Sequence, residues 1–276
     1  ADAFNGCSSL ESFSFEGISR LGTASFANCT SLGGTINIPA SVESIHAQPF
    51  MGCTQITGFT GPHTDSAGQI LFNISDDGAG NEVKLVEQVL PSIVNFTMSE
   101  GRYYLGCPLG ETSARTITIP STAIIGYGSI ITIPRNVETI TFGEGFDFYS
   151  CSFAAMPVGC EIYSEYASVD HSCLIVNNRI IAFSYPRNNW DNQQCYRLPS
   201  DVTFAAKVEL SPMVDQSSYC WGLVFPSSVT FSTLGVIDYS FGGSGSYIFE
   251  SGDTALSALE NASTGSYRVI LPEASY

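Results

Sequence analysis

Few segments of the sequence bring together side chains that could carry chemistry. Asp170-His171-Ser172 contains the three residue types of a hydrolytic relay, in which histidine takes a proton from serine while aspartate orients the imidazole. Neighbouring residues on an extended chain point to opposite faces and cannot form such a relay, so we expect a turn before the strand at Cys173. The sequence also lacks a Gly-x-Ser-x-Gly elbow, a phosphate-binding loop and a His-Glu-x-x-His motif. We therefore predict no catalytic residues and a protein that is not an enzyme.

Acidic side chains offer two further possibilities, calcium binding and sugar cleavage. Residues 76–82 gather oxygen ligands as a calcium loop does, but without the spacing of a known loop, so we expect a hairpin turn. Glu43, Glu138 and Asp201 follow prolines at similar positions and invite comparison with the paired carboxylates of glycosidases. We expect these three side chains to form a solvated acidic stripe instead.

The cysteines and histidines give no support to metal or cofactor chemistry. No Cys-x-x-Cys is present, and His46, His63 and His171 lie far apart in the sequence. The spacing of a zinc site is absent, and we predict neither a metal site nor a cofactor. Nine cysteines cannot all pair within the chain, so at least one is free or forms an intermolecular bond.

A repeated Phe-x-x-Cys-x-x-Leu/Ile segment organises the first part of the chain. A repeated residue at one position of a coil becomes a stacked, buried row when the coils pack on one another. We therefore interpret the cysteines as small apolar core residues, not as functional thiols. The predicted repeat core consists of Phe4, Cys7, Leu10, Phe26, Cys29, Leu32, Phe50, Cys53 and Ile56.

A second unit alternates with the first and reads Ile-polar-Ile-Pro, followed by Val and Ile three residues apart. The alternation predicts a short strand with one buried face, and the proline ends its hydrogen-bonding ladder. One such unit cannot bury its apolar face alone, so successive strands must stack at about 4.8 Å. The segments with this pattern are 36–45, 117–120, 131–140, 198–202, 225–229 and 269–272.

Two longer segments interrupt the repeats and predict hairpins, because each reads as two strands around a polar turn. The first joins residues 68–73 to 84–86 and the second spans residues 172–186. Residues 247–256 are a candidate third copy. Helical periodicity is nearly absent, and the best helical candidates are single turns at the Phe-x-x-Cys segments.

The repeat segments at residues 4–10, 26–45 and 50–56 resemble the BspA-like class of leucine-rich repeats. The resemblance implies a β-rich leucine-rich-repeat solenoid with short stacked parallel strands, inserted hairpins and few helical turns. We expect one solenoid over residues 1–276, with the clearest repeats at 1–60 and degenerate repeats with hairpin insertions at 61–276. The resemblance also implies secreted or cell-surface proteins that act as adhesins or interaction modules, without enzymatic activity or cofactor.

The composition limits the partners of the chain. Ten basic residues against 26 acidic ones give a formal net charge of -16, which disfavours nucleic acid and anionic membranes. No apolar run has the length of a membrane helix, so we predict no membrane insertion in this segment. Four sequons are compatible with glycosylation in a eukaryotic secretory route, at Asn28, Asn73, Asn95 and Asn261.

These observations predict an extracellular or cell-surface scaffold that binds a protein or glycan ligand by adhesion. The chain starts and stops inside repeats, without polar capping units at either end. We expect a fragment of a longer surface protein. The alternative is a structural subunit that associates head to tail into an extracellular filament.

Overall fold

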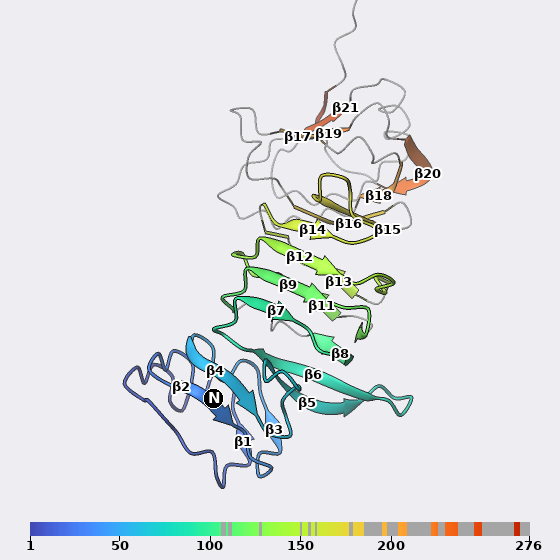
Figure 1. Ribbon diagram of the computed structural model, residues 1–276. Helices are drawn as coiled ribbons and strands as arrows, with labels where there is room; N and C mark the ends of the chain where they lie inside the picture. Colours follow the sequence, from blue (N-terminus) through green and yellow to red (C-terminus); the bar gives the residue numbers. More distant parts are fainter. Residues whose placement is uncertain are drawn as a thin grey trace, which may run out of the picture. The chain divides into compact units, whose positions relative to one another are not determined.

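Short strands that pair from one coil to the next are the main regular structure of the described chain (Figure 1). The computed structural model describes residues 1–105, 109, 112–126, 129–149, 151–153, 156–157, 159–176 and 179–184, and beyond these only residues 195–197, 204–208, 222–225, 230–236, 246–249 and 268–270. The chain forms two units, Ala1–Ser152 and Phe153–Tyr276. The described residues contain strands and turns but no α-helix, and the predicted β-rich repeat solenoid is confirmed.

The first coils of unit 1 carry two pairs of parallel strands. β1 (Arg20–Leu21) pairs with β3 (Ser44–Ile45), and β2 (Gly33–Asn37) pairs with β4 (Gln55–Thr60). The Phe-x-x-Cys segments form tight turns, in which the N–H of Cys53 donates to the carbonyl of Phe50 at 3.0 Å. Adjacent turns are joined as well, because the N–H of Phe26 donates to the carbonyl of Pro49 at 2.8 Å.

The phenylalanines of these turns stack along the coils. Phe26 lies between Phe4 and Phe50, with ring centroids 4.9 Å and 5.6 Å away. The prediction of a buried repeat core is confirmed for the second and third repeats, at Phe26, Cys29, Leu32, Phe50, Cys53 and Ile56. It is wrong for Cys7, which is exposed, and Phe4 and Leu10 are only half-buried. In the structure the first coil contacts a neighbouring coil on one side only, whereas the second has a coil on each side.

A long hairpin follows, as the sequence predicts. β5 (Ile70–Asp76) and β6 (Glu82–Val89) are antiparallel, with Asn73 opposite Leu85 in the register. β6 then pairs in parallel with β8 (Gly101–Leu105), and β8 pairs in parallel with β10 (Ala123–Ile125). The hairpin is thus built into a sheet of the repeat fold.

Three parallel strands of unit 1 lie side by side in another sheet and are visible as a stack of arrows in Figure 1. They are β7 (Asn95–Thr97), β9 (Thr116–Ile119) and β12 (Thr139–Phe142). Phe96, Ile117 and Ile140 are opposite one another in the register and are buried. The two short strands β11 (Ser129–Ile131) and β13 (Cys151–Phe153) follow β10 and β12 in the chain.

Unit 2 begins with β14 (Glu161–Tyr163) and contains a second hairpin. β15 (Cys173–Val176) and β16 (Arg179–Phe183) are antiparallel, which confirms the prediction for residues 172–186. Parallel pairing joins β16 to β18 (Phe204–Val208) and β18 to β20 (Thr230–Val236). A separate set of parallel strands consists, in order, of β17 (Cys195–Arg197), β19 (Gly222–Phe225), β21 (Ser246–Phe249) and β22 (Arg268–Ile270). Most of the candidate third hairpin, and residues 198–202, lie outside the described residues.

Candidate functional site

The Asp170-His171-Ser172 segment belongs to a turn before β15, as predicted. Asp170 Oδ1 accepts hydrogen bonds from the hydroxyls of Ser168 at 2.8 Å and Ser172 at 2.7 Å. The backbone N–H of His171 donates to the carbonyl of Ser168 at 2.9 Å, which closes the turn. The imidazole lies elsewhere, with Nδ1 at 3.2 Å from the carbonyl oxygen of Ile162. The carboxylate therefore orders the loop before β15.

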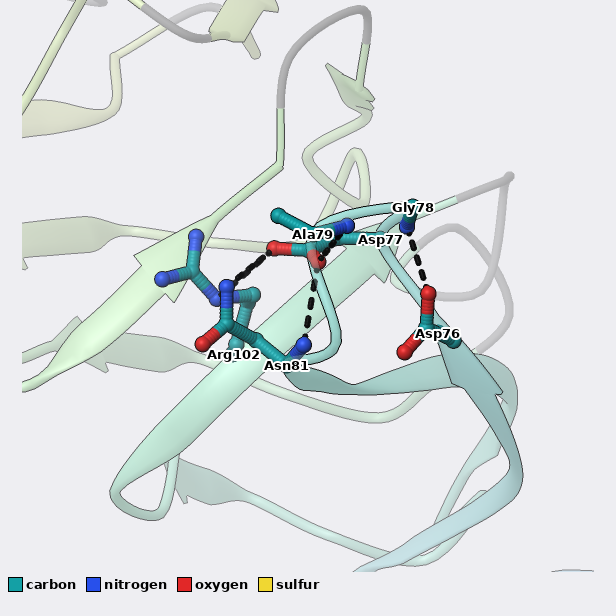
Figure 2. A network of polar contacts seen from close by, with 6 residues as sticks. All are labelled: Asp76, Asp77, Gly78, Ala79, Asn81 and Arg102. Atoms are coloured by element: carbon teal, nitrogen blue, oxygen red, sulfur yellow. Dashed lines mark hydrogen bonds and ion pairs between the residues drawn. The ribbon is translucent and has the colours of Figure 1, made fainter.

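The acidic segment at residues 76–82 forms the tip of the β5–β6 hairpin. Asp77 Oδ1 accepts the backbone N–H groups of Ala79 at 2.9 Å and Asn81 at 3.1 Å, while Oδ2 accepts the Asn81 amide at 2.8 Å. Figure 2 shows this carboxylate directed across the turn toward Asn81 and Arg102. The Asn81 side chain, the two N–H groups and Arg102 hold the pKa of Asp77 below its ordinary value. The carboxylate oxygens of Asp77 thus stabilise the hairpin turn that the sequence predicts.

Two of the three carboxylates that we expect to form an acidic stripe lie in the described residues. Glu43 and Glu138 are both exposed, but Glu138 forms a 2.8 Å ion pair with Arg115 of the preceding coil. Asp201 lies outside the described residues. The pair is itself exposed and joins two coils at the surface, where such pairs contribute little to stability.

The described part of the chain contains no group of three or more His, Cys, Asp or Glu side chains that could hold a metal ion. His63 is engaged with the backbone, since Nε2 lies 2.8 Å from the carbonyl oxygen of Val42 and Nδ1 lies 3.1 Å from that of Phe72. His63 therefore joins the loop after β2 to the β5 strand.

The repeated cysteines bind the backbone of the neighbouring coil. Cys29 Sγ donates to the carbonyl of Phe4 at 3.1 Å, and Cys53 Sγ donates to the carbonyl of Phe26 at 3.0 Å. Burial raises the pKa of the Cys53 thiol to about 11 and also raises that of Cys29. Both side chains are buried, which agrees with their interpretation as core residues.

The sequons differ in how accessible their asparagines are. Asn28 and Asn95 are exposed, whereas Asn73 is half-buried. The Asn73 amide nitrogen donates to the carbonyl of Ile45 at 2.6 Å and to Glu87 Oε1 at 2.9 Å, so both of its hydrogens are used. Asn261 lies outside the described residues. The N-glycosylation of these residues stays a prediction.

Sequence reasoning did not identify the polar outer face of β7, β9 and β12. Thr97, Thr118 and Thr141 are opposite one another in the register, and alternation with buried neighbours directs them outward. A parallel row lies two residues earlier and consists of Asn95, Thr116 and Thr139. The Thr-x-Thr pattern of β9 and β12 was a visible signal for these rows.

A second surface feature missed in the sequence is an aromatic cluster on β14. The rings of Tyr163 and His171 stack with centroids 4.2 Å apart and planes at 29°. The Tyr163 hydroxyl donates to Glu161 Oε2 at 2.8 Å, and this bond raises the pKa of Tyr163. The alternation of Glu161 and Tyr163 around Ile162 indicated that they share a face, but nothing in the sequence indicated the position of His171.

Comparison with known proteins identifies the class of the repeats. Residues 1–76 match the family model described as a BspA type leucine rich repeat region, with six copies. This match supports the resemblance to the BspA-like leucine-rich-repeat family, and the N-terminal part of unit 1 is such a repeat region.

The other comparisons add little to this assignment. The crystal structure of a leucine rich cell surface protein from Faecalibacterium prausnitzii is similar with a TM-score of 0.37 and 13% sequence identity. The alignment covers 100% of this chain and 63% of that chain. The search of curated proteins found no match. Within the described residues, no helix is long and apolar enough to cross a membrane.

Proposed function

We propose that this chain is a non-enzymatic extracellular or cell-surface repeat protein that acts as an adhesion scaffold for protein or glycan ligands. The BspA type repeats at residues 1–76 support this role, as does a composition that is acidic and poor in lysine and arginine. The non-enzymatic role is also supported by the use of Asp170 as a turn-forming residue.

One observation carries the proposal: the two polar rows on the outer face of β7, β9 and β12. Parallel pairing in register puts equivalent side chains about 4.8 Å apart along the stack. The rows contain hydroxyl and amide groups and no charged side chain. A partner can therefore contact several coils at once through equivalent groups, and many weak contacts add up to useful avidity.

Binding arrays test this proposal. The purified chain should bind at least one member of a glycan microarray or an array of secreted extracellular proteins. Replacing Thr118 and Thr141 together by Glu should reduce that binding at least about tenfold, because two carboxylates must then be desolvated at the interface. Ser75→Glu, at an exposed position of β5, is the matched control and should bind like the original chain. Absence of binding on both arrays, or full binding by the double variant, would contradict the proposal.

Head-to-tail association into filaments stays a prediction. Sedimentation velocity over a wide range of protein concentration, combined with electron microscopy, is the measurement that tests it. Concentration-independent monomers would exclude this alternative for the chain, and regular filaments would favour it over the scaffold role.

A further inference from the structure

The aromatic cluster on β14 has the properties of a small binding platform. We call the group Glu161, Tyr163 and His171 the Tyr163 platform. Glu161 and Tyr163 occupy outward-facing positions on either side of the buried Ile162. Tyr163 is 37% exposed although His171 covers one face of its ring. The side chain therefore keeps a surface that a ligand can reach.

The backbone holds the platform in an unusual conformation. His171 has φ of +57°, in the left-handed region that residues other than glycine seldom adopt. Its position is fixed by two backbone hydrogen bonds, from His171 N–H to the Ser168 carbonyl and from Ile162 N–H to the His171 carbonyl, at 2.9 Å and 2.7 Å. Strained backbone persists where the surroundings enforce it and is concentrated at ligand-contacting sites. Here the strain places an imidazole flat against a surface tyrosine.

The polar groups of the platform are arranged around the ring. The Tyr163 hydroxyl is committed to Glu161 Oε2 at 2.8 Å, which leaves the other carboxylate oxygen as an acceptor at the ring edge. Further apolar surface lies in the following loop, where Tyr166 is 39% exposed and Val169 is 79% exposed. The platform thus combines a partly exposed aromatic ring with a hydrogen-bond acceptor and contains no lysine or arginine.

We propose that the Tyr163 platform binds a neutral pyranose ring of a glycan, with the C–H face of the sugar against Tyr163 and a sugar hydroxyl donating to Glu161. A pyranose offers an apolar C–H face and hydroxyl donors at its rim, which match the ring and the carboxylate. This inference rests on the proposed scaffold function and names one ligand class and one site for it.

The charges distinguish this ligand from other molecules that stack on aromatic rings. Nucleotides and acidic sugars carry negative charge, and the Glu161 carboxylate together with a net charge of -16 disfavours both. A neutral sugar meets no such repulsion and gains hydrogen bonds that are strengthened by the charge of the acceptor.

Saturation-transfer difference NMR tests the site directly, with methyl β-D-glucopyranoside, methyl β-D-galactopyranoside and methyl α-D-mannopyranoside as probes. We expect enhancement of the C–H protons on one face of at least one probe. Tyr163→Phe should keep this signal because the ring remains, and Tyr163→Ala should lose most of it. His171→Gly is a second variant whose backbone favours the positive φ, so it tests the contribution of the imidazole without unfolding the turn. Circular dichroism spectra should be the same for all variants.

Tyr149→Ala is the matched control, since Tyr149 is 75% exposed on unit 1 and lies outside the platform. The platform proposal fails if no probe gives a signal, or if the signal survives in Tyr163→Ala. If the original chain binds a member of the glycan or protein array while Tyr163→Ala binds it equally, the platform is refuted and the scaffold function stands. If the array experiments find no ligand either, both proposals fail.

Discussion

The side-chain amide of Asn73 bonds to both backbone polar groups of Ile45. Asn73 Oδ1 accepts the Ile45 N–H at 2.9 Å, and Nδ2 donates to the Ile45 carbonyl at 2.6 Å. This is the pair of hydrogen bonds that a strand residue would supply in a ladder. A side chain from β5 thereby continues the β1–β3 sheet where the inserted hairpin interrupts the succession of coils.

Gln88 has the same role at the turns. In the earlier coils, the N–H of Phe26 donates to a backbone carbonyl, that of Pro49, in the next coil. Phe50 N–H donates instead to Gln88 Oε1 at 3.2 Å, and the fully buried Gln88 amide donates to the Val89 carbonyl at 2.9 Å. The amide side chains of Asn73 and Gln88 therefore bond to backbone groups of Ile45 and Phe50, where the hairpin follows the first coils.

Removing the Asn73 amide should destabilise unit 1. We expect Asn73→Leu to lower the free energy of unfolding by about 1–3 kcal/mol, because the buried Ile45 backbone loses its partners. The matched control is Asn95→Leu at an exposed strand position, where we expect a change within about 0.5 kcal/mol. Urea unfolding followed by circular dichroism measures both. Equal stability of the two variants would mean that the bridge is dispensable.

The same contacts predict which sequons carry sugar in a glycosylating host. We expect glycans at the exposed Asn28 and Asn95 in the secreted protein, and an unmodified Asn73. A glycan on Asn73 would remove an amide hydrogen that bonds to Ile45 or Glu87. Peptide mapping with and without glycosidase treatment gives the occupancy at each site. A folded product with a glycan on Asn73 would be inconsistent with this structure.

The features that could be predicted from the sequence are those whose residue pattern lies within one short segment. The Phe-x-x-Cys turns and the Ile-polar-Ile strands repeat at short intervals, and the hairpins show a polar turn between apolar runs. Asn73 and Gln88 were not predicted as bridges, because their partners Ile45 and Phe50 lie far away in sequence and are set by the register. The stacking of His171 on Tyr163 depends on the left-handed backbone conformation of His171. Glycine is the residue that usually signals this conformation in a sequence, and position 171 is not a glycine, so the stack could not be predicted.

The phenylalanine stack should contribute strongly to stability. Phe26 is 2% exposed and contacts the rings of Phe4, Phe13, Phe15 and Phe50. Phe26→Ala should lower the free energy of unfolding by about 3–5 kcal/mol, because it empties a buried aromatic site. Phe4→Ala removes the same group from a half-buried position and should cost clearly less. Urea unfolding of both variants checks the order, and a larger effect at Phe4 would contradict the stacking.

The repeated cysteines should differ in reactivity along the stack. Cys7 is exposed, whereas Cys29 and Cys53 are buried and bonded to the backbone of the adjacent coil. A thiol whose pKa is near 11 has little thiolate at neutral pH, so Cys53 should resist alkylation. Iodoacetamide labelling with peptide-level mass spectrometry should modify Cys7 first in the native chain and all three cysteines in urea. Rapid native labelling of Cys53 would argue against its burial.

Alkaline pH should destabilise unit 1 through Cys53 and Tyr103. Burial raises the pKa of the Cys53 thiol from 9.0 to about 11 and, with the charge of Asp65 adding to the effect, that of Tyr103 from 10.0 to about 12. Both groups ionise more readily in the unfolded chain, so their contribution to the free energy of unfolding is fully present below pH 9.0. This contribution is lost as the pH rises through the folded-state pKa values, about 11 for Cys53 and about 12 for Tyr103. Tyr103→Phe keeps the buried ring and should lose less stability between about pH 10 and about pH 12 than the original chain. Tyr149→Phe, at an exposed tyrosine, should follow the original curve in denaturant titrations across this range. A Tyr103→Phe curve that coincides with the original would show that the phenol is not the group that titrates.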